Sequence, residues 1–189
     1  MSEETVNTHH INMFLEGKRI RLREVCIEDV NEIYYRWLND PEITRYLESR
    51  FYPNSIISLR NYVKNNSGNK DNLLLAIILK EENRHIGNIK LGPINWLHRF
   101  SDVGLLIGEK DCWGKGYATE AIKLISNHAF DHLNLHKLIA GSYDVNKGSI
   151  QAFKKAGFSI EGIRKRHYFC ENRYIGHVML GLINKKMEK

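Results

Sequence analysis

Residues 103–122 combine, in one short stretch, the features of a loop that binds phosphate at the start of a helix. An apolar run at 103–107 leads into a loop with Gly114 and Gly116, and a helical pattern follows at once. Glycine lets the backbone approach a ligand closely, because it has no Cβ. The first turn of a helix adds unpaired amides and the positive end of the helix dipole. These features are together those of a phosphate or pyrophosphate site.

The residues of this loop exclude two common nucleotide-binding motifs. Lys115 is followed by Gly116 rather than by serine or threonine, so the loop is not a P-loop. Thr119 stands where a dinucleotide fingerprint has its third glycine. Taken alone, the two glycines favour an ordinary strand-to-helix turn, so the ligand assignment depends on the rest of the chain.

The periodicity of apolar residues predicts the elements that position this loop. Alternating or continuous apolar runs predict strands, whereas spacings of three and four residues predict helices. The expected strands are 18–24, 72–80, 84–91, 101–108, 136–143, 158–168 and 174–183, and the expected helices run from 28 to a stop at 39–41, 55–63, 114–133 and 147–155. This order, βααβββαβαββ, predicts a mixed sheet covered by helices, in the α+β or α/β class.

Local signals set the boundaries of the first two helices. Glu28 and Asp29 suit the positive end of a helix dipole and predict that the first helix begins there. Pro41 disfavours helix at the residue before it, which predicts where that helix ends. Ser55, or else Asn54, is the expected N-cap of the second helix.

The length and composition fit one globular domain. The chain has 189 residues, of which 42% are hydrophobic and 26% charged, so we expect a flexible leader at 1–14 and a single domain at 15–189. No apolar run reaches the ~20 residues of a membrane-spanning helix. The polar N-terminus shows no signal-peptide pattern. Cys26, Cys112 and Cys170 are too scattered for a metal site or a disulfide framework, so we expect a cytoplasmic protein without metal.

The chain is basic, with 28 Lys and Arg against 22 Asp and Glu and a net charge of +6. This charge alone is compatible with a nucleic-acid partner, with an anionic ligand or with solubility. The basic residues are dispersed, apart from short runs at 164–167 and 185–186 that are typical of solvated surfaces. We therefore expect no nucleic-acid and no membrane partner, and a non-catalytic binding module stays as an alternative of another class.

Three separate segments carry a further pattern. Residues 113–118 read Trp-Gly-Lys-Gly-Tyr-Ala, and residues 146–158 begin with Asn146 and Ser149 and end in Gly-Phe. The first resembles the acetyl-CoA signature Gln/Arg-x-x-Gly-x-Gly/Ala of the GCN5-related N-acetyltransferase (GNAT) superfamily, with Trp113 where Gln or Arg is usual. The second resembles another segment of that superfamily. Residues 37–46 are similar to the branch of ribosomal-protein alanine acetyltransferases, and the resemblance covers about residues 17–183.

The resemblance implies a GNAT-type fold, an α/β sandwich with a mixed, largely antiparallel sheet of about seven strands flanked by helices. It implies acetyl-CoA as the cofactor, with the pyrophosphate on residues 113–118. The strand at 103–108 is expected to splay from the strand at 136–143, with the pantetheine arm in the gap. The residues implied at the cofactor are Leu105, Leu106, Ile107, Trp113, Gly114, Lys115, Gly116, Tyr117, Ala118, Thr119, Asn146, Ser149 and Phe153.

Acetyl transfer to an amine also requires groups that remove and supply protons. Many superfamily members use a tyrosine acid where this chain has Phe153, and Ser149, one turn earlier, is the replacement that the resemblance implies. Ser149 is equally compatible with a helix cap or a contact to CoA. Asp102, at the start of the splayed strand, is the first candidate for the base, although it also fits a residue that merely orients a loop.

The residues expected to contact the acceptor are Glu48, Arg50, Asn88 and Tyr143. Glu48 and Arg50 are equally compatible with a surface ion pair, and Tyr143 with a core residue. A similarity to acetyltransferases of surface-sugar pathways favours a small-molecule amine such as an amino-sugar nucleotide. A protein N-terminus or a polyamine is the alternative, and a polyamine requires a densely acidic pocket. A non-catalytic CoA-binding module and a homodimer also stay open.

Overall fold

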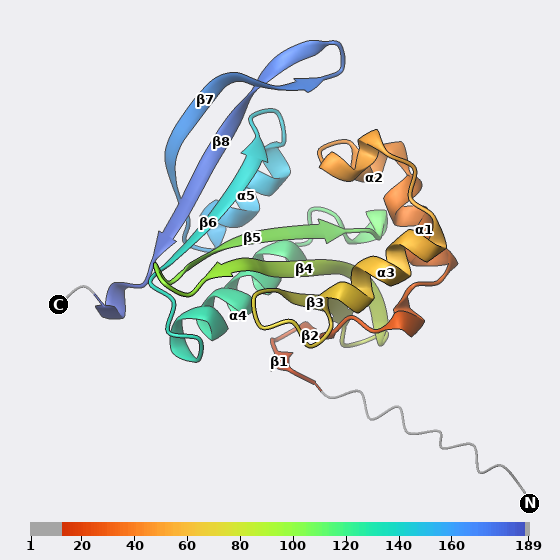
Figure 1. The fold of residues 1–189 in the computed structure, drawn as a ribbon, viewed down its shortest axis with the longest axis horizontal. Helices are drawn as coiled ribbons and strands as arrows, with labels where there is room; N and C mark the ends of the chain where they lie inside the picture. Colours follow the sequence, from red (N-terminus) through yellow and green to blue (C-terminus); the bar gives the residue numbers. More distant parts are fainter. Residues whose placement is uncertain (1–12, 188–189) are drawn as a thin grey trace, which may run out of the picture.

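The computed structural model describes residues 13–187, which form one mixed sheet with helices on both faces (Figure 1). The sheet has eight strands in the order β1-β2-β3-β4-β5-β6-β8-β7. The strands are β1 (Leu15–Glu16), β2 (Ile20–Glu24), β3 (Leu73–Leu79), β4 (Arg84–Asn95), β5 (Phe100–Ile107), β6 (Lys137–Tyr143), β7 (Ser159–Cys170) and β8 (Arg173–Ile183). The α-helices are α1 (Glu32–Asn39), α2 (Pro41–Thr44), α3 (Ile56–Asn66), α4 (Tyr117–Asp131) and α5 (Lys147–Lys155). All neighbouring strands are antiparallel except β5 and β6.

The two faces of the sheet carry separate cores. On the α4 face, Ile122 of α4 and Ile150 of α5 pack on the sheet. On the α1 face, Trp37 of α1 and Leu59 of α3 pack on it. The side chains of β3 alternate between the two cores, which explains why its sequence is apolar at every position.

The predicted splay between two central strands is confirmed. The strands β5 and β6 pair only at their first residues, Phe100–Asp102 with Lys137–Ile139. Beyond Asp102 and Ile139 the two strands diverge, and Figure 1 shows them pointing apart. We call the space between them the splayed gap. A β-strand that loses its partner exposes backbone donors and acceptors, so the gap can accept an extended ligand.

Two helix boundaries differ from the sequence prediction. Glu28 and Asp29 belong to a short 3₁₀ helix, η1 (Ile27–Asp29), and the helix α1 begins only at Glu32, where the Asn31 side chain caps it. Asp29 is buried and bonds Arg23 at 2.6 Å, so it stabilises η1 and strand β2 rather than a helix start. Pro41 ends α1 as predicted but also begins the short helix α2.

Three further differences are small. The sheet has eight strands rather than about seven, because Leu15 and Glu16 pair with β2. The helix α4 begins at Tyr117 rather than at residue 114. The leader expected at 1–14 lies outside the described residues except for Met13 and Phe14. None of the described helices has both the length and the apolar character that crossing a membrane requires.

Candidate functional site

The predicted phosphate loop follows β5 and leads directly into α4. A 3₁₀ turn, η3 (Lys110–Cys112), comes first, and Gly114 and Gly116 then adopt φ angles of +73° and +84°. Gly116 is the N-cap of α4 and has no side chain to bond the amides of the first turn. These amides therefore point outward without a side-chain cap, as anion binding at a helix N-terminus requires. Nothing lies within 4 Å of the position that a Cβ at Gly114 would take, so this part of the loop is open.

Two charged residues that the sequence analysis missed, Arg19 and Glu120, hold the loop in place. The Arg19 guanidinium donates to the Lys115 carbonyl at 2.8 Å and to Glu120 at 2.9 Å, and it lies 4.7 Å from the centre of the Tyr117 ring. Burial raises the pKa of Glu120. Hydrogen bonds from Arg19 and from the backbone amide of Ile20 outweigh this effect and hold that pKa below its ordinary value. Because 96 residues separate Arg19 from Lys115, no local sequence signal connects them.

One cavity of about 510 Å³ connects the phosphate loop with the splayed gap. It is bounded by β5, the phosphate loop, the first turns of α4 and α5, and residues 42–47. Among the residues predicted at the cofactor, those that line it are Leu105, Leu106, Ile107, Trp113, Gly114, Gly116, Tyr117, Ala118, Thr119, Asn146 and Ser149. The structure thus brings together three segments that are far apart in the sequence.

Two residues predicted at the cofactor lie elsewhere. Phe153 is only 2% exposed, and its ring packs against Phe158 in the core on the α4 face, so it does not line the cavity. Its helical position turns the ring inward, whereas Ser149 and Ala152 of the same helix line the cavity. Lys115 is exposed and also outside the lining, and its backbone carbonyl is occupied by Arg19.

Ser149 lies at the start of α5 and lines the cavity. Asn146 caps this helix, and its side-chain oxygen accepts a hydrogen bond from the Ser149 amide at 3.1 Å. Asn146 therefore performs the capping that was the structural alternative for Ser149. The Ser149 side chain is half-buried at the cavity wall, where its hydroxyl can act on a ligand.

Three of the four residues predicted at the acceptor meet on the α1 face. The Tyr143 hydroxyl donates to Glu48 at 2.7 Å and accepts from Arg50 at 2.8 Å. Tyr168 of β7, which the sequence analysis missed, stacks on Tyr143 with ring centres 4.4 Å apart. Burial raises the pKa of Tyr143 to about 12, and the hydrogen bond to Glu48 acts in the same direction, so this hydroxyl stays protonated at neutral pH.

Asp102 lies where the splayed gap begins. Val103 packs in the core on the α4 face, so the alternating neighbours Asp102 and Gly104 face the α1 side. Space is open around Gly104, where nothing lies within 4 Å of an added Cβ. Burial raises the pKa of Asp102 to about 6, and the charge of Lys90 opposes this shift. A carboxylate with such a pKa can both accept and release a proton near neutral pH.

Asn88 was expected at the acceptor, but the structure places it in the interior of the fold. It is 6% exposed and its side-chain oxygen lies 2.8 Å from a ring nitrogen of His85. Its strand position places it opposite Ala76, a residue of the core beneath α1 and α3. Asn88 and His85 thus form a buried polar pair, and Asn88 is not among the residues that line the cavity.

The segment between α1 and α3 connects the phosphate loop to the β7–β8 hairpin. Lys110 of the phosphate loop bonds Asp40 at 2.8 Å and Glu42 at 2.6 Å. At the other end, Arg45 bonds Glu171 of the hairpin turn at 2.6 Å. Figure 1 shows α2 facing the hairpin across the open ends of the strands. These contacts hold residues 42–47, which form one wall of the cavity, between the phosphate loop and the β7–β8 hairpin.

On the acceptor side of the splayed gap, negatively charged side chains lie close to positively charged ones. Glu42 is paired with Lys110 and Glu171 with Arg45. Asp102 interacts with Lys90, and Glu48 shares the Tyr143 hydroxyl with Arg50. Among the described residues, the acceptor side is therefore balanced in charge and does not form a densely acidic pocket.

Comparisons with known proteins agree with this geometry. The model of the acetyltransferase (GNAT) domain matches residues 19–159. The chain is 26% identical over 178 residues to an uncharacterized N-acetyltransferase, p20, of Bacillus licheniformis, covering 91% of this chain and 97% of that one. It is 35% identical to the spermidine N(1)-acetyltransferase of Escherichia coli over 88 residues, 47% of each chain. A structure of spermidine N-acetyltransferase from Vibrio cholerae in complex with CoA and spermine is similar, with a TM-score of 0.81, 21% identity, and coverage of 92% of this chain and 100% of that one.

Proposed function

This chain belongs to the GNAT acetyltransferase family and is an N-acetyltransferase that uses acetyl-CoA, and on that premise we propose that its acceptor is the primary amine of a small molecule such as an amino-sugar nucleotide. The observation that carries this choice is the charge balance on the acceptor side. Each carboxylate described there has a cation beside it, so an amine with several positive charges gains little electrostatic attraction.

The residues of the cavity fit acetyl-CoA. The uncapped first-turn amides of α4 suit its pyrophosphate, and the open position at Gly114 leaves room for it. The residues from Leu105 to Ile107 line the cavity where β5 has lost its partner strand, which suits the amide groups of the pantetheine arm. When bound, acetyl-CoA supplies a thioester, from which an amine takes the acetyl group and a thiolate departs.

Two residues of the chain are assigned to the proton transfers. Asp102 receives the proton of the acceptor ammonium through a water, because it lies on the same face of β5 as the open space at Gly104 and is largely ionised above pH 6. Ser149 donates a proton to the departing thiolate and regains one from the N–H of the nitrogen that has attacked, because its side chain lies on the cavity wall while Asn146 caps the helix. Transfer is direct, without a covalent enzyme intermediate.

A polyamine is the second candidate acceptor. The observation that favours it is the similarity to spermidine N-acetyltransferases in sequence and in fold. The sequence match covers less than half of each chain, and the structural similarity at 21% identity concerns the fold. Spermidine is therefore included beside amino sugars in the test.

The proposal is tested by mixing the protein with acetyl-CoA and a panel of amines while thiol release is followed. The panel contains amino sugars, their phosphate and nucleotide esters, spermidine and short peptides with free N-termini. Mass spectrometry identifies the acetylated product. A preference for spermidine or for peptides contradicts the proposed acceptor. A thermal shift with CoA, about 2.7 kcal/mol of stabilisation at a hundredfold excess over Kd, checks the cofactor site independently.

A further inference from the structure

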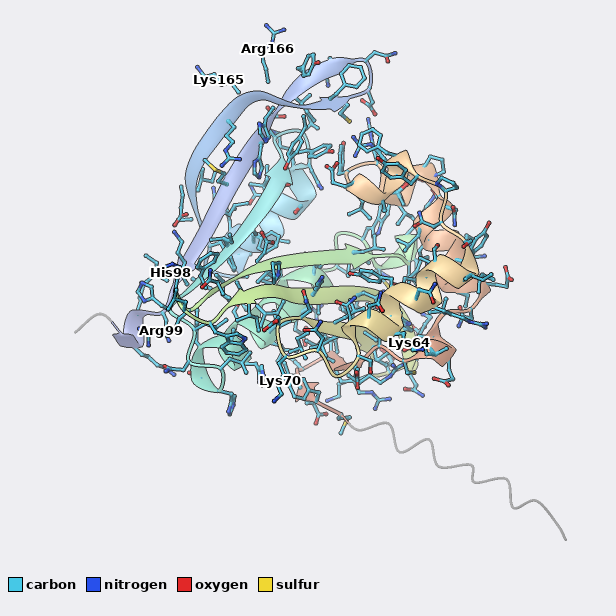
Figure 2. All side chains as sticks on the ribbon, in the orientation of Figure 1. Lys64, Lys70, His98, Arg99, Lys165 and Arg166 are labelled. Atoms are coloured by element: carbon cyan, nitrogen blue, oxygen red, sulfur yellow. The ribbon has the colours of Figure 1, made fainter. Side chains whose placement is uncertain are left out.

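The backbone that follows β5 is held from the α1 side by the indole of Trp37. Figure 1 shows α1 beside the end of this strand, and Figure 2 shows side chains filling the space between them. Trp37 is only 1% exposed, and a Cβ added at Gly108 would lie 2.0 Å from its ring. Glycine at residue 108 therefore allows the ring to lie directly against the backbone. The indole N–H donates to the carboxylate of the next residue, Glu109, at 2.9 Å.

The carboxylate of Glu109 uses its two oxygens for two different elements. Oε1 accepts from Trp37 of α1, and Oε2 lies 3.1 Å from Nη1 of Arg84, the first residue of β4. Only 21% of the Glu109 side chain is exposed, so solvent and salt screen this ion pair less than they screen one on an open surface. One side chain thus connects α1 and β4 at the point where the chain leaves the sheet for the phosphate loop.

The backbone hydrogen bonds of the sheet end at this point. On one side, β5 pairs with β6 only as far as Asp102. On the other side, its pairing with β4 ends at Ile107. The next two amides, of Gly108 and Glu109, both donate to the single carbonyl of Ile86, at 2.9 and 3.2 Å. The side chain of Glu109 therefore sets the direction in which the loop leaves the strand.

This direction matters for a ligand that contacts both the strand and the loop. Residues 105–107, directly before Gly108, line the cavity, and Gly114 and Gly116 of the phosphate loop line it as well. The loop has its own separate support, because Arg19 bonds the Lys115 carbonyl and Glu120. Loss of the Glu109 contacts is therefore expected to shift the loop relative to β5 while its internal geometry is kept.

We propose that Glu109 is a positioning residue that holds residues 105–107 and the phosphate loop at the separation that one acetyl-CoA molecule requires. This inference rests on the proposed function, because it takes the pyrophosphate to bind at the loop and the pantetheine arm at β5. A ligand that contacts both segments depends on their separation, whereas a ligand that contacts the loop alone does not. Binding is strongest when the protein needs no rearrangement to make both contacts.

The experiment compares the affinities of two probes, CoA and ADP. ADP carries a pyrophosphate but no pantetheine arm, so it can contact the loop without contacting β5. Calorimetry measures CoA binding, and competition with CoA measures ADP binding. Glu109→Ala removes both contacts of the carboxylate and is expected to weaken CoA binding about tenfold, while ADP affinity changes less than about twofold.

Two milder variants remove one contact each and keep the test decisive if Glu109→Ala does not fold. Trp37→Phe keeps an aromatic ring against Gly108 but lacks the N–H donor. Glu109→Gln keeps an oxygen for the indole but loses the charge that attracts Arg84. Each is expected to weaken CoA binding about threefold, again without a matching loss for ADP. Urea unfolding shows that each variant is folded under the conditions of the titration.

Glu82→Gln is the matched control for the loss of a negative charge beside Arg84. Glu82 also pairs with Arg84, at 2.7 Å, but it lies in the turn before β4 and outside the cavity lining. CoA affinity in this variant should equal that of wild type. A loss as large as in Glu109→Gln assigns the effect to charge alone and overturns the positioning role.

The two probes also separate this inference from the proposed function. Unchanged CoA affinity in the Glu109 and Trp37 variants, or equal losses of CoA and ADP affinity, overturns the positioning role but leaves the acetyltransferase intact. ADP that fails to compete with CoA in wild type contradicts the pyrophosphate site and, with it, this inference. Absence of CoA binding or of acetylation by wild type contradicts the proposed function itself.

Discussion

The hydroxyl of Tyr143 joins Glu48 and Arg50, which lie on the other side of the splayed gap from the phosphate loop. It donates to the Glu48 carboxylate at 2.7 Å and accepts from the Arg50 guanidinium at 2.8 Å. The ring also stacks on Tyr168 of the β7–β8 hairpin. One hydroxyl thus fixes two charged side chains from the segment after α2 against the end of β6.

Tyr143→Phe keeps the ring and removes only this hydroxyl. Because a hydrogen bond to a charged group contributes about 1.5–3 kcal/mol, kcat/KM for the acceptor should fall roughly ten- to a hundredfold. The Kd of CoA should stay unchanged, because Tyr143 lies outside the residues that line the cofactor cavity. Steady-state kinetics and CoA titration measure the two effects, and a fall in CoA affinity of similar size contradicts the assignment.

Gly116→Asp tests the phosphate loop. Gly116 has a φ of +84°, so any side chain there costs about 1–2 kcal/mol of backbone strain. Gly116→Ala carries that strain without the charge and serves as the control. CoA affinity, measured by calorimetry, should be at least tenfold lower for the aspartate variant than for the alanine variant, because the charge repels the pyrophosphate. Equal CoA affinities in the two variants contradict a pyrophosphate site at the N-terminus of α4.

Arg19→Gln tests whether CoA binding by the phosphate loop depends on the hydrogen bonds from Arg19. The variant loses the bonds from the guanidinium to Lys115 and Glu120, and CoA affinity should fall about fivefold with kcat unchanged at saturation. Glu120→Gln should act in the same direction, and the double variant should lose less than the product of the two effects. Lys186→Gln, which breaks the ion pair with Asp131 at the far end of α4, is the control and should leave CoA affinity intact.

Asp102→Asn should lower activity and raise stability at the same time. In the folded chain the pKa of Asp102 is raised to about 6 from an ordinary 3.8, chiefly by burial. Folding therefore favours the protonated form, and ionisation of Asp102 destabilises the fold progressively from about pH 4 upward, reaching its full cost above pH 6. That cost is on the order of 3 kcal/mol, and the asparagine variant avoids it.

The stability of Asp102→Asn, measured by urea unfolding, should exceed that of wild type at pH 8 and match it near pH 4. The wild-type kcat/KM should rise as the pH increases through about 6, because Asp102 ionises there. This rise should be absent in Asp102→Asn. An unchanged pH profile removes Asp102 from the proton transfer.

Ser149→Ala should reduce kcat while CoA binding persists. General acid catalysis contributes about 10²–10⁴-fold, so a reduction of roughly a hundredfold is expected. The fold should tolerate the change, because Asn146 rather than Ser149 caps α5 with its side chain. Single-turnover kinetics measure the chemical step directly, and an unchanged rate assigns Ser149 to a structural role.

The sequence predicted the order of helices and strands along the chain, and the glycine-containing loop before α4, because both have local signals. Apolar periodicity marked each main strand, and two glycines beside a helical pattern marked Gly114 and Gly116. It missed the start of α1, because the carboxylate of Asp29 bonds a distant strand residue, Arg23, instead of a helix end. Local patterns cannot show which of several possible partners a side chain finds.

The site was predicted less completely for the same reason. Residues on the phosphate loop lie together in the chain, and most of them line the cavity. Asn88 and Phe153 were misplaced because the direction of a side chain depends on strand register and helix rotation. Arg19 and Tyr168 were missed because their partners, Lys115 and Tyr143, lie far away in the sequence and are brought close only by the fold.

The most direct test of the central claim is the acetylation panel with wild-type protein and acetyl-CoA. Thiol release with an amino sugar or its nucleotide ester, at a kcat/KM at least tenfold above that with spermidine, is the expected result. Release that is fastest with spermidine, or absent for every amine although CoA binds, contradicts the claim that this chain acetylates a small-molecule amine such as an amino-sugar nucleotide.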